Sequence, residues 1–406
     1  MADSETTTMT GADALVYTLA DHGVTACFAN PGTSEMHLVT ALDRETRINS
    51  VLCLFEGVAT GAADGYGRVK GEPAMTLLHL GAGYLNGGAN IHNAKRAKTP
   101  MVNVIGDHAV DHRKYDAPLN SDIMGLAGPN SIWIKSADTV GATGKLAAEA
   151  WAASFGPEPG PVSLILPADS AWTEGGVKGG AARRPSLRQT PPEKIEAAAA
   201  AIGRASQPVI LINGTALSEE GLGHAARLKK AGVRIITDTF YAKMRRGAGV
   251  FAPDRMQYFA EGAMDDLEGS DLMILAGTHK PAAFFAYPGK PSLLVPEGCT
   301  VLDLGGADTD SAKTLAALAD AMGANEAAPP APLDKPAAPT GELDARAVGK
   351  SVARHMPENA IVSDDGVSNS MPVFLSTIKA EPHDWMGLTG GAIGQGLPLA
   401  LGAAVA

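Results

Sequence analysis

The feature that most constrains the fold of this 406-residue chain is a repeated alternation of short apolar, β-branched runs with segments of helical periodicity. This alternation is typical of a parallel sheet covered by helices on both faces. The spacing of apolar residues over 11–22 predicts a helix ending near Gly23. The strand-like runs that follow are residues 24–30, 48–55, 73–80, 100–107 and 161–167. We therefore expect an α/β, doubly wound first domain over residues 1–175, with 48–55 as a buried strand that leads into a small-residue helix at Glu56.

A second α/β unit is expected over residues 196–323, and two linkers separate it from its neighbours. Its strand candidates are 208–214, 233–239, 271–277 and 300–306. Residues 176–195 are rich in Gly, Pro and charge, and residues 324–342 are rich in Pro and Ala, which predicts linkers.

A third unit, residues 343–406, is expected to begin with a helix at 343–355 and a strand at 360–365. One clear strand in about 65 residues cannot bury enough surface for an independent α/β domain. We therefore expect this domain to be incomplete, because the chain is truncated or the rest is supplied elsewhere.

Composition excludes several classes of protein. The net charge of −11 argues against nucleic acid or an anionic membrane as a partner. The acidic, polar N-terminus lacks the apolar region of a signal peptide, and no uncharged apolar stretch is long enough to span a membrane. Cys27, Cys53 and Cys299 lie far apart without metal-ligand spacing, as expected for reduced thiols. We expect a cytoplasmic protein.

Four segments carry a resemblance to the acetolactate synthase and benzoylformate decarboxylase branch of the thiamine-diphosphate (ThDP) enzymes. They are FANPGTSEMHL (28–38), LFEGVATGAADGYGRVKG (54–71), LLHLGAGYLNGGANIHNA (77–94) and GLTGGAIGQGLPLALGAA (387–404). The resemblance implies that family's order of domains along the whole chain: pyrimidine-binding, central and diphosphate-binding, the last incomplete here.

Glu56 lies where an apolar run ends and a helix is expected to begin. Burial there would favour a protonated carboxyl, which can donate a hydrogen bond. A helix N-terminal acid stabilised by the macrodipole is the alternative. In the family, the matching glutamate hydrogen-bonds N1′ of the aminopyrimidine ring and thereby activates the cofactor, which carries out the carbanion chemistry.

The turn from Pro31 and Gly32 through Thr33, Ser34 and Glu35 resembles the family's active-site loop, with Thr33 at the place of a substrate-contacting serine. Pro31 and Gly32 would border the cofactor. A plain helix start with Ser34 as N-cap is the other interpretation.

His79 matches the active-site histidine of benzoylformate decarboxylase and follows a strand, where open α/β sheets place ligands. A buried structural histidine is the alternative. His108 and His112 lie in a loop that borders the active site in related enzymes. Phe285 stands where benzoylformate decarboxylase has a second catalytic histidine, which weakens a simple decarboxylase function.

At the C-terminal end, Gly391 and Ile393 match the residues whose carbonyl and apolar side chain hold the cofactor in its bent form. Ser368 and Asn369 fall near the family's diphosphate contacts. The family's Mg²⁺-binding motif is absent up to Ala406, so we expect no metal ligands in this chain and a Mg²⁺ site beyond it. No FAD-binding pattern is present, so FAD is not expected.

The resemblance implies ThDP-dependent carboligation of 2-oxo acids such as pyruvate, as in acetolactate synthase. The first alternative is a non-oxidative 2-oxo acid decarboxylase of the benzoylformate decarboxylase type. The second is a non-catalytic protein with a ThDP-binding fold. The family builds its active sites between subunits, which implies a homodimer or homotetramer. This chain alone is expected to be inactive.

Overall fold

The computed structural model describes residues 8–406, which form two compact units. The first unit contains the residues up to Ser186 together with Leu388–Ala406, and the second is Leu187–Gly387. The expected third domain, residues 343–406, is therefore divided between the two units.

A six-stranded sheet in the order β2-β1-β3-β4-β6-β5 forms the centre of the first unit, and all its pairings are parallel. Its strands are β1 (Ala26–Asn30), β2 (Asn49–Leu52), β3 (Ala74–Leu78), β4 (Met101–Asp107), β5 (Trp133–Ser136) and β6 (Pro161–Pro167). The expected parallel, doubly wound α/β architecture is confirmed. β5 was not predicted, because its four residues, WIKS, do not form an apolar run.

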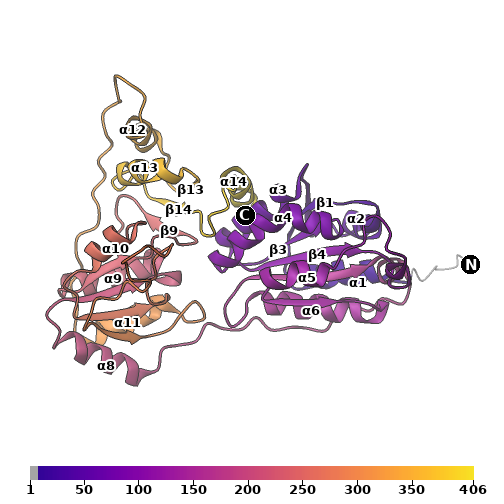
Figure 1. Ribbon diagram of the computed structural model, residues 1–406, viewed down its shortest axis with the longest axis horizontal. Coiled ribbons are helices and arrows are strands. Elements are labelled where there is room, and N and C mark those ends of the chain that lie inside the picture. Colours follow the sequence, from indigo (N-terminus) through magenta and orange to yellow (C-terminus); the bar gives the residue numbers. More distant parts are fainter. Residues whose placement is uncertain (1–7) are drawn as a thin grey trace, which may run out of the picture. The chain divides into compact units, whose positions relative to one another are not determined.

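Helices cover both faces of this sheet, with α1 and α6 on one face and α3 and α4 on the other (Figure 1). Alternate residues of β4 show why: Val102 and Val104 join the first core, whereas Met101 and Ile105 join the second. The helices are α1 (Gly11–Asp21), α2 (Met36–Arg44), α3 (Glu56–Lys70), α4 (Leu80–Ala97), α5 (Ile123–Ala127), α6 (Thr143–Ser154) and α7 (Ala168–Trp172).

The prediction of a buried strand at 48–55 is wrong. β2 is the edge strand, and its Leu52 is 71% exposed, while Leu54 beyond its end is 92% exposed. Apolar composition alone cannot distinguish an edge strand from a central one, because the difference is set by which neighbours pair with it.

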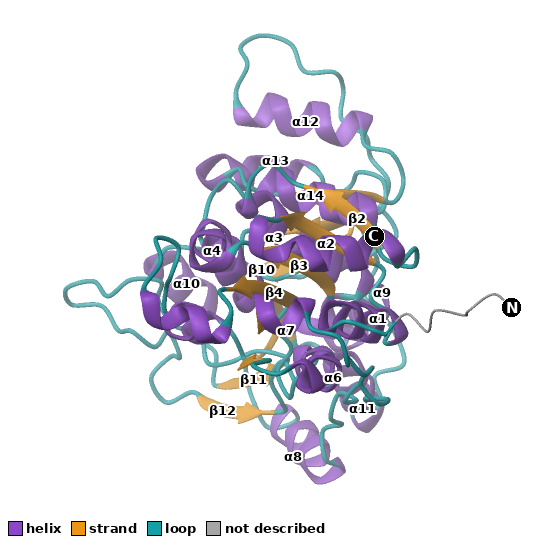
Figure 2. Cartoon of the chain, turned by 90° about the vertical axis from the view of Figure 1, so that its right-hand side faces the viewer, coloured by secondary structure: helices purple, strands orange, loops and turns teal. Residues whose placement is uncertain are grey.

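Helix α14 (Gly396–Val405) lies beside α3 in the same unit (Figure 2). A Cβ atom on Gly402 would lie 1.7 Å from the carbonyl oxygen of Ala62, and one on Gly65 would lie 2.0 Å from that of Leu399. Two glycines thus let the helix backbones approach closely, which explains part of the small-residue pattern of α3.

The second unit contains a parallel five-stranded sheet, β10-β8-β7-β11-β12, and a three-stranded mixed sheet, β13-β14-β9. The strands are β7 (Pro208–Ile212), β8 (Arg234–Thr237), β9 (Met244–Arg246), β10 (Asp254–Arg255), β11 (Leu272–Ala276), β12 (Thr300–Asp303), β13 (Ala360–Ser363) and β14 (His383–Met386). Four of the five-stranded sheet's members match the predicted runs.

The helices of the second unit are α8 (Pro192–Ile202), α9 (Glu219–Lys230), α10 (Ala260–Leu267), α11 (Ser311–Ala321), α12 (Ala345–His355) and α13 (Ser370–Ser376). Apolar residues of α8, α9 and α11 share one core with the five-stranded sheet, and those of α10 share the core on its other face. Within the described part of the chain, none of the helices is both long and apolar enough to cross a lipid bilayer.

Candidate functional site

The carboxyl ends of β1, β3 and β4 are neighbours in the sheet of the first unit. The turn at residues 31–35 follows β1, His79 follows β3, and Asp107 ends β4. Ligands of open α/β sheets bind at this edge, so the fold gathers several predicted site residues at a suitable place.

Glu35 and His79 form a partly buried carboxylate–imidazole pair. Nδ1 of His79 lies 2.8 Å from Oε2 of Glu35, and the Glu35 side chain is fully buried. The same oxygen accepts a hydrogen bond from the Gly32 amide at 2.7 Å. An ionised carboxylate can only accept, so with Glu35 ionised the bond requires a proton on Nδ1, and Nε2 is then the ring nitrogen available to a ligand.

Two glycines make room for this pair. A Cβ atom on Gly32 would lie 2.2 Å from His79 Nδ1, and one on Gly106 would lie 1.7 Å from Oε1 of Glu35. Larger residues at either position would displace Glu35 or His79, so both glycines are required by close approach.

The backbone turns sharply directly after His79. Leu80, the first residue of α4, is buried and has φ of 47°, in the left-handed region that leucine rarely adopts. Such a conformation costs on the order of 1–3 kcal/mol and occurs preferentially at functional sites. Here it accompanies the placement of His79 at the junction between β3 and α4.

The other members of the 31–35 turn make fewer contacts. Ser34 Oγ lies 3.4 Å from His79 Nδ1, and the side chain makes no N-cap hydrogen bond, so the alternative of a capping serine is wrong. Thr33 is exposed, and Pro31 is half-buried.

Glu56 is the first residue of α3 and is only 6% exposed. Its Oε2 accepts a hydrogen bond from Nδ2 of Asn86 on α4 at 2.9 Å. Its Oε1 has no hydrogen-bond partner among residues 8–406 and faces Gly83, where an added Cβ atom would lie 3.2 Å away. One oxygen is thus fixed by the protein, and the other has no protein partner among the described residues.

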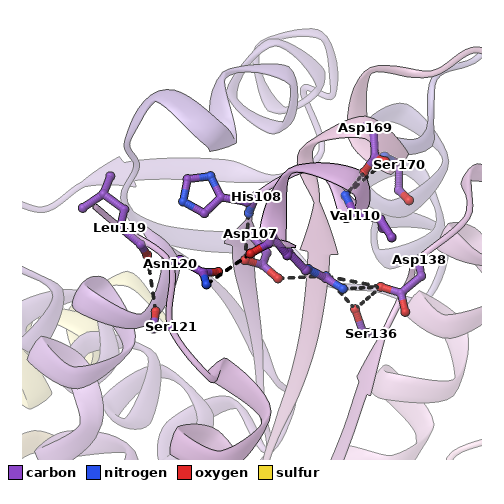
Figure 3. Close-up of polar contacts among 11 residues, drawn as sticks. Asp107, His108, Val110, Leu119, Asn120, Ser121, Ser136, Asp138, Asp169 and Ser170 are labelled. Atoms are coloured by element: carbon purple, nitrogen blue, oxygen red, sulfur yellow. Dashed lines mark hydrogen bonds and ion pairs between the residues drawn. The ribbon is translucent and has the colours of Figure 1, made fainter. Parts of the chain in front are cut away.

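The loop after β4 is held by charged side chains (Figure 3). Oδ2 of Asp107 pairs with Arg113 at 2.8 Å, and Arg113 also pairs with Asp138. Burial raises the pKa of the Asp107 carboxyl, and the neighbouring Arg113 opposes that rise. The Asp169 carboxylate accepts from the Val110 amide at 3.2 Å and so fixes the start of the 3-10 helix that follows.

The two histidines of this loop differ in exposure. The rings of His108 and His112 lie 5.3 Å apart, but His112 is exposed, whereas Nε2 of His108 is buried without a hydrogen-bond partner among the described residues. The geometry therefore places His108 closer to the core than His112.

Gly391 and Ile393 lie in the loop before α14, within the first unit. Gly391 has φ of 76°, and Ile393 is 73% exposed. Ser368, Asn369 and Phe285 lie in the second unit and are exposed. Val367, next to Ser368, has φ of 48°, a strained value for a β-branched residue.

Several site residues were not identified from the sequence. Asn86, Asn90 and Asn93 recur at helical spacing on α4, which could have indicated a polar face, and Gly106 precedes a strand-terminal aspartate. Among residues 8–406, no group of three or more His, Cys, Asp or Glu side chains has the arrangement of a metal site, so no Mg²⁺ ligation can be assigned to them.

Comparison with known proteins identifies the family. Residues 9–126 match the family model described as "Thiamine pyrophosphate enzyme, N-terminal TPP binding domain". The chain is 48% identical over 404 residues to the "Putative acetolactate synthase large subunit IlvX" of Mycobacterium tuberculosis, covering 98% of this chain and 77% of that protein. It is 26% identical over 419 residues to the benzoylformate decarboxylase of Pseudomonas aeruginosa, covering 96% and 77%.

A solved structure shares the fold. The ThDP-dependent 4-hydroxybenzoylformate decarboxylase of Rhodococcus jostii RHA1 superposes with a TM-score of 0.83 at 20% identity, covering 98% of this chain and 79% of that one. At this identity the likeness concerns the fold alone.

Proposed function

Because this chain belongs to the ThDP-dependent enzyme family that includes acetolactate synthase large subunits, we propose that it takes part in carboligation of 2-oxo acids. In this reaction a 2-oxo acid such as pyruvate loses CO₂ and its remaining carbon skeleton is joined to a second carbonyl compound. The bound cofactor supplies the electron sink for the carbanion chemistry.

The observation that carries this proposal is the environment of Glu56. Its carboxyl is nearly buried, one oxygen is held by Asn86, and the other oxygen is free beside Gly83. A carboxyl held in this way can hold a proton at Oε1 and share it with a ring nitrogen of an aminopyrimidine. Because Asn86 fixes the side chain, the carboxyl keeps its orientation when a ligand arrives.

His79 is the second group that we assign to the reaction. Its Nε2 can give or take a proton at the substrate, while Glu35 fixes the ring through Nδ1. His108 borders the same sheet edge and contributes a further imidazole to the substrate side.

Two other functions remain as alternatives. A 2-oxo acid decarboxylase of the benzoylformate decarboxylase type is favoured by His79 and by the relatives of that name. It is disfavoured by Phe285, an exposed side chain that cannot transfer protons. A non-catalytic ThDP-fold protein would keep the fold without the chemistry.

Product analysis separates these functions. The protein, with ThDP and Mg²⁺ added, is incubated with pyruvate and, separately, with benzoylformate. A coupled product such as acetolactate supports the carboligation, and aldehyde alone supports the decarboxylase. Absence of both products and of ThDP binding in a version of the chain extended with the family's Mg²⁺-binding motif supports the non-catalytic alternative.

We also propose that the protein is a homodimer or homotetramer in the cytoplasm and that Mg²⁺ accompanies the cofactor. Exposed leucines of the first unit, Leu52, Leu54 and Leu85, support an association surface. Light scattering after size-exclusion chromatography measures the assembly, and a monomer at micromolar concentration would contradict it.

A further inference from the structure

A row of three asparagines on α4 connects Glu56 to the loop that carries Gly391 and Ile393. Asn86, Asn90 and Asn93 are spaced i, i+4 and i+7, so they lie on one face of the helix. Asn86 and Asn93 are about 10 Å apart along the axis, at roughly 1.5 Å per residue. We call these residues the amide row.

The first two members hold the start of α3. Asn86 donates to Oε2 of Glu56 at 2.9 Å, and Asn90 donates to the carbonyl oxygen of Gly57 at 2.7 Å. The amide row therefore fixes both the side chain of Glu56 and the backbone that follows it.

Asn93 holds the loop. Its Nδ2 donates to the carbonyl oxygen of Ala392 at 2.9 Å, and its Oδ1 accepts from the Ala392 amide at 3.1 Å. The amide group thus satisfies both backbone polar groups of one loop residue, as a neighbouring strand would. Nδ2 also donates to Oδ1 of Asn90 at 3.2 Å, which orients the side chain, and Asn93 is fully buried.

Contacts on either side of Ala392 fix the same loop. Thr389 Oγ1 donates to the backbone carbonyl of Asn93 at 2.7 Å and accepts from Arg68 at 3.0 Å. Gln395 donates to the fully buried Asp64, which also pairs with Arg68 at 2.6 Å. The loop is therefore attached to α3 and α4 at residues 389, 392 and 395.

Between these attachments the loop presents Gly391 and Ile393 to solvent. Gly391 is exposed, and Ile393 is 73% exposed. Folding already holds this loop and its apolar side chain in place, so a ligand that binds there does not have to order them. The loop therefore has the form of a preorganised ligand contact.

We propose that Asn93 is a positioning residue that acts through Ala392 and holds the 389–395 loop for the cofactor's aminopyrimidine ring. The ligand part of this inference rests on the proposed function, whereas the attachment of the loop does not.

The test compares Asn93→Ala and Asn93→Asp with a matched control, Asn49→Ala. The aspartate side chain of the Asn93→Asp variant would keep the acceptor for the Ala392 amide and lose the donor. Asn49 is exposed and lies on the edge strand β2, outside the amide row. Hydrogen–deuterium exchange of peptides covering 388–396 is measured without cofactor, and ThDP affinity is measured by calorimetry with Mg²⁺ present.

We expect at least tenfold faster exchange of the loop in Asn93→Ala, with unchanged protection of β3 and β4. The ThDP dissociation constant should rise roughly ten- to thirtyfold, as for the loss of two neutral hydrogen bonds. Asn93→Asp should show a rise at least as large, because a carboxylate oxygen in place of Nδ2 would face the carbonyl oxygen of Ala392 and Oδ1 of Asn90 at a buried position. Asn49→Ala should match the unmodified protein.

Unchanged exchange in the 388–396 peptides would overturn the attachment. Faster loop exchange with an unchanged ThDP dissociation constant would overturn the positioning role. If the unmodified protein binds no ThDP, the proposed function and the ligand part of this inference both fail, and the exchange data alone then decide whether Asn93 holds the loop.

Discussion

His79 Nδ1 lies 2.8 Å from Oε2 of Glu35, and this pair joins the turn after β1 to the end of β3. Glu35 is fully buried, so its effect on catalysis passes through the histidine and not through contact with a substrate in solvent. The pair explains why two residues 44 positions apart belong to one site.

Replacing Glu35 with glutamine should lower kcat by roughly ten- to a hundredfold, by analogy with the partners that orient metal-ligating histidines. Glutamine keeps the size of the side chain but removes the carboxylate that fixes the proton on Nδ1. The measurement is the pH profile of kcat for Glu35→Gln, His79→Ala and the double variant. Additive losses in the double variant would show that Glu35 acts independently of His79.

Replacing Gly106 with alanine should lower stability by roughly 1–3 kcal/mol and displace Glu35, since the new Cβ atom would lie 1.7 Å from Oε1. Gly88→Ala on α4 is the control, because no heavy atom lies within 4 Å of its added Cβ. The control should be neutral or stabilising by up to about 1 kcal/mol, because alanine favours helix more than glycine. Urea denaturation measures both variants, and equal stabilities would refute the proposed crowding at Gly106.

Stability should fall in mild acid because of His383 in the second unit. Burial, together with Arg246 and Arg245, lowers the pKa of this histidine to about 4, while its Nδ1 donates to the Glu381 carbonyl oxygen at 2.7 Å. Between pH 6.5, the ordinary pKa of histidine, and about pH 4, this histidine therefore binds more protons in the unfolded chain than in the folded one. The stabilisation from this group is therefore fully present above pH 6.5 and is lost as the pH falls through that window.

The total loss of unfolding free energy from His383 across this pH window is on the order of 3 kcal/mol. His383→Asn should reduce the pH dependence of the unfolding free energy between pH 4 and 6.5, because asparagine can donate to Glu381 without titrating. The exposed His355 provides the control, and His355→Asn should leave the slope unchanged. An unchanged slope in His383→Asn would assign the acid sensitivity to other groups.

The buried strands of both parallel sheets could be predicted because central parallel strands are apolar on both faces. Runs such as 100–107 and 208–214 correspond to β4 and β7, whose residues are all buried. The edge strand β2 could not be recognised as exposed, since pairing partners decide that. β9 and β14 contain charged residues, so neither forms an apolar run that the sequence could reveal. They pair with each other although they are far apart in the sequence.

The candidate site could be predicted in part. Strand ends and family motifs in the sequence indicate Glu56, His79 and the 31–35 turn, and their roles stay predictions. The roles of Asn86 and Asn93 depend on which backbone groups face α4, and the sequence contains no signal for the position of Ala392 relative to that helix.

The central claim is that Glu56 activates bound ThDP, and the rate of deuterium exchange at the thiazolium C2 position tests it directly. The measurement uses proton NMR in D₂O with Mg²⁺ and compares the unmodified protein with Glu56→Gln. We predict that the protein accelerates C2 exchange over free ThDP and that Glu56→Gln lowers the accelerated rate by roughly 10²-fold or more. Equal rates for the two proteins, or no acceleration by the unmodified protein, would contradict the claim.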